Sequence, residues 1–180
     1  MPKSICVFAG SSPGAAPQFA EVARDLGREL ALRGHGLVYG GGNVGLMGVV
    51  ADAALAAGGH VTGVIPEFLV DRELAHRGLS RLEVVRSMHE RKDTMAQLSD
   101  GFVALPGGFG TLEELFETWT AGYLGMHDKP VVLLDPDGHY DGLLAWLESL
   151  VESGYVQPGA LERIVVVRDV EAALALCTPS

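Results

Sequence analysis

Short apolar segments and longer amphipathic segments alternate along the whole chain. The short segments are apolar at consecutive positions, a pattern typical of strands that are buried on both faces of a sheet. The longer segments repeat their apolar positions every three or four residues, which predicts helices with one buried face. Strands are expected at residues 4–9, 36–40, 60–66, 82–87, 101–106, 129–136 and 163–167, and helices at residues 17–34, 43–59, 88–99, 111–125, 140–154 and 169–177.

This alternation predicts an α/β fold, namely a doubly wound, mostly parallel sheet with helices on both faces, of the Rossmann-like kind. The length of 180 residues suits a single domain spanning residues 1–180. In such a sheet, ligands bind outside the carboxyl ends of the strands, where loops open into helices. The loops at these ends are residues 10–14, 40–45, 66–68 and 106–111.

Composition excludes several classes of partner. A formal net charge of -10 argues against a nucleic-acid binder, because phosphate backbones are held by clustered Lys and Arg. No segment approaches the roughly 18 apolar residues of a membrane span, and the apolar run after the N-terminus is too short for a signal peptide. Two cysteines are too few for a disulfide framework. We therefore expect a cytoplasmic protein that binds neither nucleic acid nor a membrane.

Gly40, Gly42 and Gly45 match the G-x-G-x-x-G pattern of dinucleotide-binding loops. The pattern normally requires an acidic residue at the end of the next strand, where this chain has Ile65 and Pro66. A dinucleotide site is therefore a weak hypothesis, and tight turning or close helix packing explains at least one of the glycines.

The stretch Pro106–Glu114 (PGGFGTLEE) allows two interpretations. Its three glycines and Thr111 can bring backbone N–H groups and a hydroxyl to a phosphate at the start of the following helix. Alternatively, Thr111 and Glu114 form a capping box, with Thr111 as the N-cap and Glu114 at the third helical position. The glycines favour the ligand site, because a cap does not need a flexible approach.

A second charged cluster, SMHERKDTM at residues 87–95, places Arg91 and Lys92 in the first turns of a helix. Cations oppose the helix dipole there, so helix stability does not explain them. They either pair with Glu90 and Asp93 on a solvated face, or serve a site in which Arg91 presents a planar fork to a phosphate or a nucleobase.

Together, SMHERKDTM, VALPGGFGTLEELFE, GGGNVGLMG and GSSPG resemble the LONELY GUY family of cytokinin riboside 5'-monophosphate phosphoribohydrolases, over about residues 4–168. The resemblance implies hydrolysis of the N-glycosidic bond of (N6-modified) adenosine 5'-monophosphates, giving the free base, a cytokinin or adenine, and ribose 5-phosphate. It also implies a homodimer and no cofactor. Where the family usually has Cys before the first G-S-S, this chain has Ala9.

The resemblance implies Arg91 and Glu114 as the catalytic pair. It also implies a set of substrate-binding residues, to which we add Ser11 and Gly42 from the two upstream glycine loops. The full set is Glu73, Lys92, Gly108, Phe109, Gly110, Thr111, Leu112, Glu113, Thr120, Ser11 and Gly42. The chemistry of the residues agrees, since a carboxylate stabilises an oxocarbenium-like state or activates water, and the departing base needs a donor.

Other functions remain open at this point. A non-catalytic carrier of a nucleotide or of molybdenum cofactor would need the glycine loops but not Arg91 and Glu114. A lysine decarboxylase needs a Schiff-base lysine, and only Lys3, Lys92 and Lys129 exist. The six histidines show no metal-ligand spacing, so no metal is expected.

The helix that begins after the PGGFG glycines carries apolar residues whose role is open. They either line a pocket for an N6 substituent or belong to the core or to an interface, and we favour the core or an interface. These residues, in the helix and just after it, are Trp119, Tyr123, Leu124 and Met126.

Overall fold

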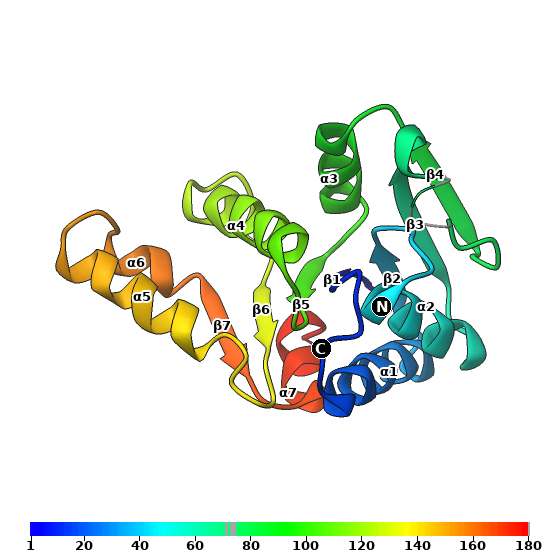
Figure 1. Cartoon of the computed structure of the whole chain (residues 1–180), viewed down its shortest axis with the longest axis horizontal. Helices are drawn as coiled ribbons and strands as arrows, with labels where there is room; N and C mark the ends of the chain where they lie inside the picture. The colour runs from blue at the N-terminus through cyan, green and yellow to red at the C-terminus, as the bar shows by residue number, and fades with distance from the viewer. Residues whose placement is uncertain (71, 73–74, 180) are drawn as a thin grey trace.

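The computed structural model describes residues 1–70, 72 and 75–179, and within these ranges the strands form one parallel sheet (Figure 1). The strands are β1 (Ser4–Phe8), β2 (Gly36–Tyr39), β3 (Val61–Pro66), β4 (Arg81–Val85), β5 (Gly101–Ala104), β6 (Val131–Leu134) and β7 (Ile164–Val167). Their order across the sheet is β4-β3-β2-β1-β5-β6-β7. The predicted doubly wound α/β fold is therefore confirmed.

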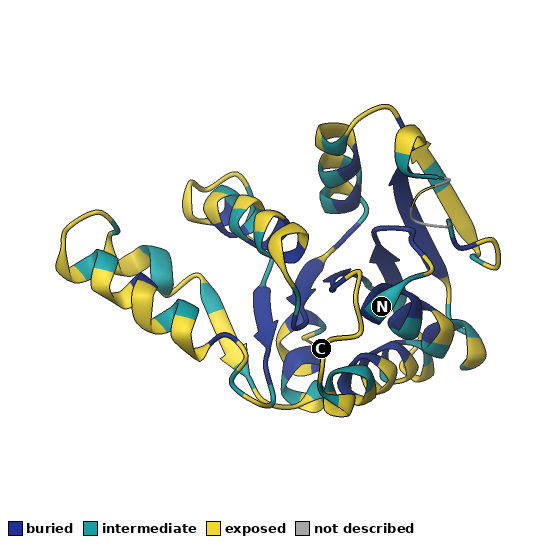
Figure 2. Cartoon of the chain, viewed as in Figure 1, coloured by how far each residue is buried: buried dark blue, intermediate teal, exposed yellow. Residues whose placement is uncertain are grey.

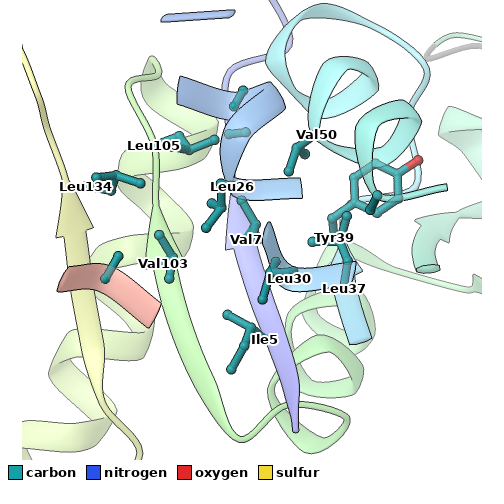
Figure 3. Close-up of a cluster of buried hydrophobic side chains, with 14 of the residues drawn as sticks. Ile5, Val7, Leu26, Leu30, Leu37, Tyr39, Val50, Val103, Leu105 and Leu134 are labelled. Carbon is teal, nitrogen blue, oxygen red and sulfur yellow. The ribbon is translucent and has the colours of Figure 1, made fainter. Parts of the chain in front are cut away.

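The helices of the two faces pack differently. The helices are α1 (Pro17–Leu32), α2 (Gly45–Ala56), α3 (Met88–Gln97), α4 (Phe109–Tyr123), α5 (Asp141–Glu152), α6 (Pro158–Leu161) and α7 (Val170–Cys177), with a 3-10 turn, η1, at Glu67–Leu69. Helices α1, α2 and α7 cover one face around a dense core that includes Leu26, Val50 and Leu174. Figure 3 shows part of this core, with Ile5 and Val7 of β1 surrounded by side chains from neighbouring strands and helices.

Helices α3, α4 and α5 cover the other face through a smaller cluster that includes Met95, Leu115 and Tyr140. These three helices are separated from one another on that face (Figure 1). Helices α5 and α6 carry mostly exposed or half-buried residues (Figure 2). Leu147 is the one buried residue of α5, and α6 has none. This face is therefore incompletely covered in a single chain.

The direction in which strands are added to the sheet reverses between β1 and β5. From β1 the chain builds outward to β4 and then returns to add β5 on the other side of β1. The loop after β1 leads to α1 on one face, whereas the loop after β5 leads to α4 on the opposite face. Such a switch point is where open α/β sheets bind ligands.

Several elements differ from the sequence prediction. Helix α4 begins at Phe109, two residues before the expected start, and the short helix α6 lies in a stretch for which no element was predicted. Strand β4 lies at the edge of the sheet and is mostly exposed. In the described part of the chain, we find no helix that is both long and apolar enough to cross a bilayer.

Candidate functional site

Three glycine-containing loops meet at the carboxyl ends of β1, β2 and β5. The Gly10 carbonyl accepts a hydrogen bond from the Leu46 N–H at 2.9 Å, which ties the loop after β1 to the start of α2. A Cβ on Gly45 would lie 2.3 Å from the backbone of Ser11. A Cβ on Gly10 would lie 3.4 Å from Gly107 Cα, so the loop after β5 is also in contact. The sheet thus brings together three segments that are far apart in the sequence.

The start of α2 argues against a dinucleotide site. Both Leu46 and Met47 direct their backbone N–H groups to the Gly10 carbonyl, at 2.9 and 3.4 Å. In a dinucleotide-binding loop these helix N-terminal donors would hold the pyrophosphate. Since the Gly10 carbonyl occupies the place that a pyrophosphate would take, the glycines of the G-x-G-x-x-G match serve the packing of the two loops.

Arg91 is buried beneath these loops, with 4% of its surface exposed. It extends from α3 to the ends of two strands, where Nη2 donates to the Gly40 carbonyl at 2.7 Å and Nε to the Val64 carbonyl at 3.1 Å. A Cβ on Gly40 would lie 2.2 Å from Nη2. The first glycine of the G-x-G-x-x-G pattern is therefore required for the guanidinium to reach its position.

Glu114 lies in α4 and is 9% exposed. Its charge and that of Arg91 both act on the buried thiol of Cys6 in the central strand β1. Burial raises the pKa of Cys6 well above its ordinary value, Glu114 raises it further, and a hydrogen bond with Ser99 and the charge of Arg91 lower it. The structure thus brings a buried cation from α3 and a buried carboxylate from α4 near the same strand.

The capping-box interpretation of Thr111 and Glu114 is wrong. The N-cap of α4 is Gly108, no side chain caps the helix, and Thr111 is the third helical residue. Thr111 is buried and packs against the loop, where a Cβ on Gly107 would lie 2.1 Å from its Oγ1. Thr111 is held by this packing and does not act as the cap. Glu114 consequently lies in the second turn of α4 and does not cap it.

The glycine loop, residues 105–108, opens into the exposed start of α4. Side chains added at Gly108 or Gly110 would meet no atom within 4 Å, and Phe109 is 95% exposed. The first N–H groups of a helix have no partner within the helix. This part of the loop therefore offers donors and open space on its outer side, as a phosphate cradle requires.

Lys92 points away from Arg91, toward α4. Its Nζ forms ion pairs with Glu113 and, at 2.6 Å, with Glu117. Burial lowers the pKa of Lys92, but the hydrogen bonds with the two carboxylates outweigh this effect and raise it above its usual value. Lys92 and Glu113 thus join α3 to α4.

A groove of about 950 Å³ lies between α3 and α4. Lys92, Glu117 and Thr120 line it together with apolar side chains such as Phe116 and Met126. Thr120 is nine residues beyond Thr111, or about 13 Å along a helix, so the structure does not bring it to the glycine loop.

The remaining predicted residues have different surroundings. Ser11 is exposed in the loop after β1, and Gly42 pairs with Ala75 through an isolated β-bridge. Leu112 packs against the core of its face. Glu73 lies outside the described residues. Among the described residues, no group of three or more His, Cys, Asp or Glu side chains could hold a metal ion.

Sequence reasoning missed the residues that support the glycine loop from β6. The Tyr140 hydroxyl donates to the Leu105 carbonyl at 2.7 Å, and His139 Nε2 lies 3.1 Å from the Gly107 carbonyl. The available signal was Asp135 at the end of an apolar strand, followed by the Pro-Asp-Gly turn. It marked a turn but not its contact with another loop.

Fold and site together define a Rossmann-like α/β protein whose glycine-containing loops meet where the strand order reverses. Residues 47–177 match a family model described as "Possible lysine decarboxylase". A cytokinin riboside 5'-monophosphate phosphoribohydrolase of Mycobacterium tuberculosis is 52% identical over 177 residues, covering 98% of this chain and 94% of the relative. One from Arabidopsis thaliana is 50% identical over 163 residues, covering 91% and 76%. The chain belongs to this LONELY GUY family of phosphoribohydrolases, as its motifs predicted.

A solved structure with a similar fold is the molybdenum cofactor carrier protein of Chlamydomonas reinhardtii. It superimposes with a TM-score of 0.71 at 24% identity, covering 97% of this chain and 95% of the carrier. At this level of identity the likeness shows the fold alone.

Proposed function

We propose that this protein hydrolyses the N-glycosidic bond of adenosine 5'-monophosphate and of its N6-modified relatives. Water adds its hydroxyl to C1' of the ribose and its proton to the base, so the products are ribose 5-phosphate and a free adenine or cytokinin. The observation that carries the proposal is the pair of buried side chains, Arg91 and Glu114, beside an open glycine loop. The relatives with about 50% identity support the same reaction.

Glu114 suits the central step of this reaction. Cleavage passes through an oxocarbenium-like state, which a nearby carboxylate stabilises or relieves by activating water. A buried carboxylate acts more strongly than one in water, because fewer solvent dipoles screen its charge. Arg91 supplies a fixed positive charge for the phosphate or for the departing base.

The substrate phosphate would bind at the glycine loop. Gly108, Phe109, Gly110 and Thr111 provide the backbone donors of the first turn of α4, where the helix dipole favours an anion. Ser11 and Gly42 would contribute from the two adjoining loops, and Glu113, Lys92, Leu112 and Glu73 complete the proposed nucleotide site. Thr120 would contact the substrate only at an end that extends into the groove between α3 and α4.

The family description as a lysine decarboxylase has no support in the positions of the lysines. Pyridoxal phosphate chemistry needs a lysine amine that is available for a Schiff base. Lys3 precedes β1 at the opposite end of the sheet, and Lys92 is ion-paired with Glu113 and Glu117. Lys129 Nζ donates to the Ala96 carbonyl at 2.8 Å. We infer that the phosphoribohydrolase activity describes this chain better.

The deciding experiment compares Glu114→Gln with the wild-type protein. Purified protein is incubated with AMP and with N6-isopentenyl-AMP, and free base and ribose 5-phosphate are followed by chromatography. We expect release by the wild type and a loss of at least about 100-fold in Glu114→Gln, because the amide can neither act as a base nor carry negative charge. Thermal unfolding should show that the variant remains folded.

The matched control is Glu148→Gln, which makes the same change at an exposed position of α5 and should retain full activity. Undiminished release by folded Glu114→Gln would contradict the assigned role. Tight nucleotide binding without release by the wild type would instead favour a carrier.

We also propose that the protein is a cytoplasmic homodimer. The family resemblance suggested the dimer, and the incompletely covered face of α3–α6 supports it. Exposed apolar residues gather on α4, α5 and the segments that follow them, namely Tyr123, Leu124, Met126, Trp146 and Tyr155. Exposed apolar groups of this size are typical of protein interfaces.

A further inference from the structure

The turn between β6 and α5, residues 135–140, supports the glycine loop from the side. The Tyr140 hydroxyl donates to the Leu105 carbonyl at 2.7 Å. His139 Nε2 lies 3.1 Å from the Gly107 carbonyl, which can only accept, so this nitrogen carries the hydrogen. The two bonds hold the loop on either side of Pro106.

Asp135 anchors this turn. Its side chain is fully buried, and its two oxygens accept the backbone N–H groups of His139 at 2.8 Å and Tyr140 at 3.0 Å. Arg168 donates to the Asp135 carbonyl at 2.7 Å and lies 3.6 Å from the carboxylate. These bonds fix the backbone of His139 and Tyr140, and with it the positions from which their side chains reach the glycine loop.

This support matters because the peptide that contains the Gly107 carbonyl lies between two glycines, Gly107 and Gly108. A peptide between two glycines reorients at little steric cost, since neither residue has a Cβ. The Gly107–Gly108 peptide is trans, so its carbonyl and N–H point in opposite directions. While His139 holds the Gly107 carbonyl, the Gly108 N–H points away from the β6–α5 turn. A Cβ on Gly108 would meet no atom within 4 Å, and the Gly108 carbonyl accepts a hydrogen bond from the Leu112 N–H at 3.0 Å. The Gly107–Gly108 segment is therefore held by His139 on one side and by the start of α4 on the other.

We propose that His139 and Tyr140 are positioning residues, which hold the glycine loop so that the Gly108 N–H and the first turn of α4 receive the phosphate of the substrate. The inference rests on the proposed function, because it takes the phosphate to bind at this loop. His139 and Tyr140 act through the carbonyls of Gly107 and Leu105 and need not touch the substrate.

Three variants separate this role from a general effect on folding. His139→Phe keeps an aromatic ring against Phe19 and Tyr140 but removes the donor, whereas His139→Gln retains a donor and removes the ring. Tyr140→Phe removes one hydroxyl. The measurements are calorimetric binding of ribose 5-phosphate and of AMP to the full chain, together with kcat, KM and the unfolding temperature.

For His139→Phe and Tyr140→Phe we expect the Kd for ribose 5-phosphate and the KM for AMP to rise roughly three- to ten-fold, the loss of about one hydrogen bond. The value of kcat should change less, because ground-state and transition-state binding weaken together. His139→Gln should restore most of the affinity. An unchanged unfolding temperature in His139→Phe is expected, because His139 is exposed.

Equal affinity in His139→Phe and the wild type would overturn the inference, as would equal losses in His139→Phe and His139→Gln. Failure of the proposed function gives a different result, namely no release of base by the wild type, and the binding comparison tests the positioning role in that case too. A wild-type protein that binds neither ribose 5-phosphate nor AMP would overturn both.

Discussion

At the scale of single residues, contacts of buried polar groups decide what each position tolerates. Gly40 accepts a hydrogen bond from Arg91 through its carbonyl and leaves the guanidinium the space that a side chain would occupy. Tyr39, the preceding residue, is fully buried, yet its hydroxyl has no hydrogen-bond partner in the described part of the chain. Of these two adjacent residues, Gly40 must lack a side chain, whereas Tyr39 carries a buried hydroxyl that lacks a hydrogen-bond partner among the described residues.

Gly40→Ala should displace Arg91, because the new methyl group would lie 2.2 Å from Nη2. We expect kcat/KM for AMP to fall by about 100-fold, the scale of effect that a misplacement of about 1 Å produces. The matched control is Gly159→Ala in α6, where a Cβ meets open space. Wild-type activity in Gly40→Ala would show that the position of Arg91 does not matter for turnover.

Tyr39→Phe should stabilise the protein. Burial and the nearby Asp52 raise the pKa of Tyr39, so the hydroxyl stays neutral and still lacks a partner. Removal of an unsatisfied buried hydroxyl should add about 1 kcal/mol to the free energy of unfolding. Urea denaturation measures this difference, and a lower stability of the variant would reveal that the hydroxyl is bonded in solution.

At the scale of elements, close approaches between helices matter more than helix propensity. Helix α1 packs on α2 at Gly27, where a Cβ would lie 2.2 Å from the Val50 carbonyl oxygen. That oxygen belongs to the backbone of α2 and cannot rotate away, so an added methyl group must push the helices apart. The same reasoning explains the start of α4, where packing of Thr111 against Gly107 outweighs its preference for a capping position.

Gly27→Ala should therefore destabilise the protein by about 1–3 kcal/mol, although alanine is the better helix former by about 1 kcal/mol. The matched control, Gly142→Ala, makes the same change in α5 where a Cβ would meet no atom within 4 Å. It should gain a few tenths to about 1 kcal/mol. Chemical denaturation of both variants tests the expected difference in sign, and similar values for the two would contradict it.

At the scale of the whole molecule, the two faces of the sheet are unequal. The face of α1, α2 and α7 is closed around a dense core, whereas α3, α4 and α5 are spread apart on the other face (Figure 1). Grooves lie between α3 and α4 and between α4 and the α5–α6 segment. Leu124 and Met126 are 66% and 75% exposed at the rim of the larger groove. A second copy of the chain would cover these residues in the proposed dimer.

Leu124→Glu combined with Met126→Glu should convert the proposed dimer to a monomer, because two carboxylates would be buried in an apolar contact. Light scattering after gel filtration measures the mass, which we expect to halve. Leu32→Glu changes a residue of similar exposure on the opposite face and should leave the mass unchanged. A wild-type protein with the mass of one chain would contradict the proposed dimer.

The local pattern was sufficient for the architecture. Apolar runs of strand length and amphipathic runs of helix length predicted the parallel α/β sheet, because both periods follow from backbone geometry within a few residues. This fold class then predicted that ligands bind at the loops beyond the carboxyl ends of the strands. Arg91 was singled out because a cation in the first turns of a helix opposes the helix dipole, and the glycines because a helix cap does not need them. The pairing of Arg91 with Glu114 came from the family resemblance and stays a prediction.

Only the tertiary structure decided how these residues meet. The bond from Arg91 to Gly40 joins residues 51 positions apart, and His139 reaches Gly107 across 32 positions. Lys92, next to Arg91 in the sequence, instead pairs with Glu113 on another helix. Local propensity carries no information on such contacts, because they depend on which surfaces the whole chain packs together. The sequence by itself therefore determined the fold and the family, while the three-dimensional packing determined which residues from distant segments lie in contact.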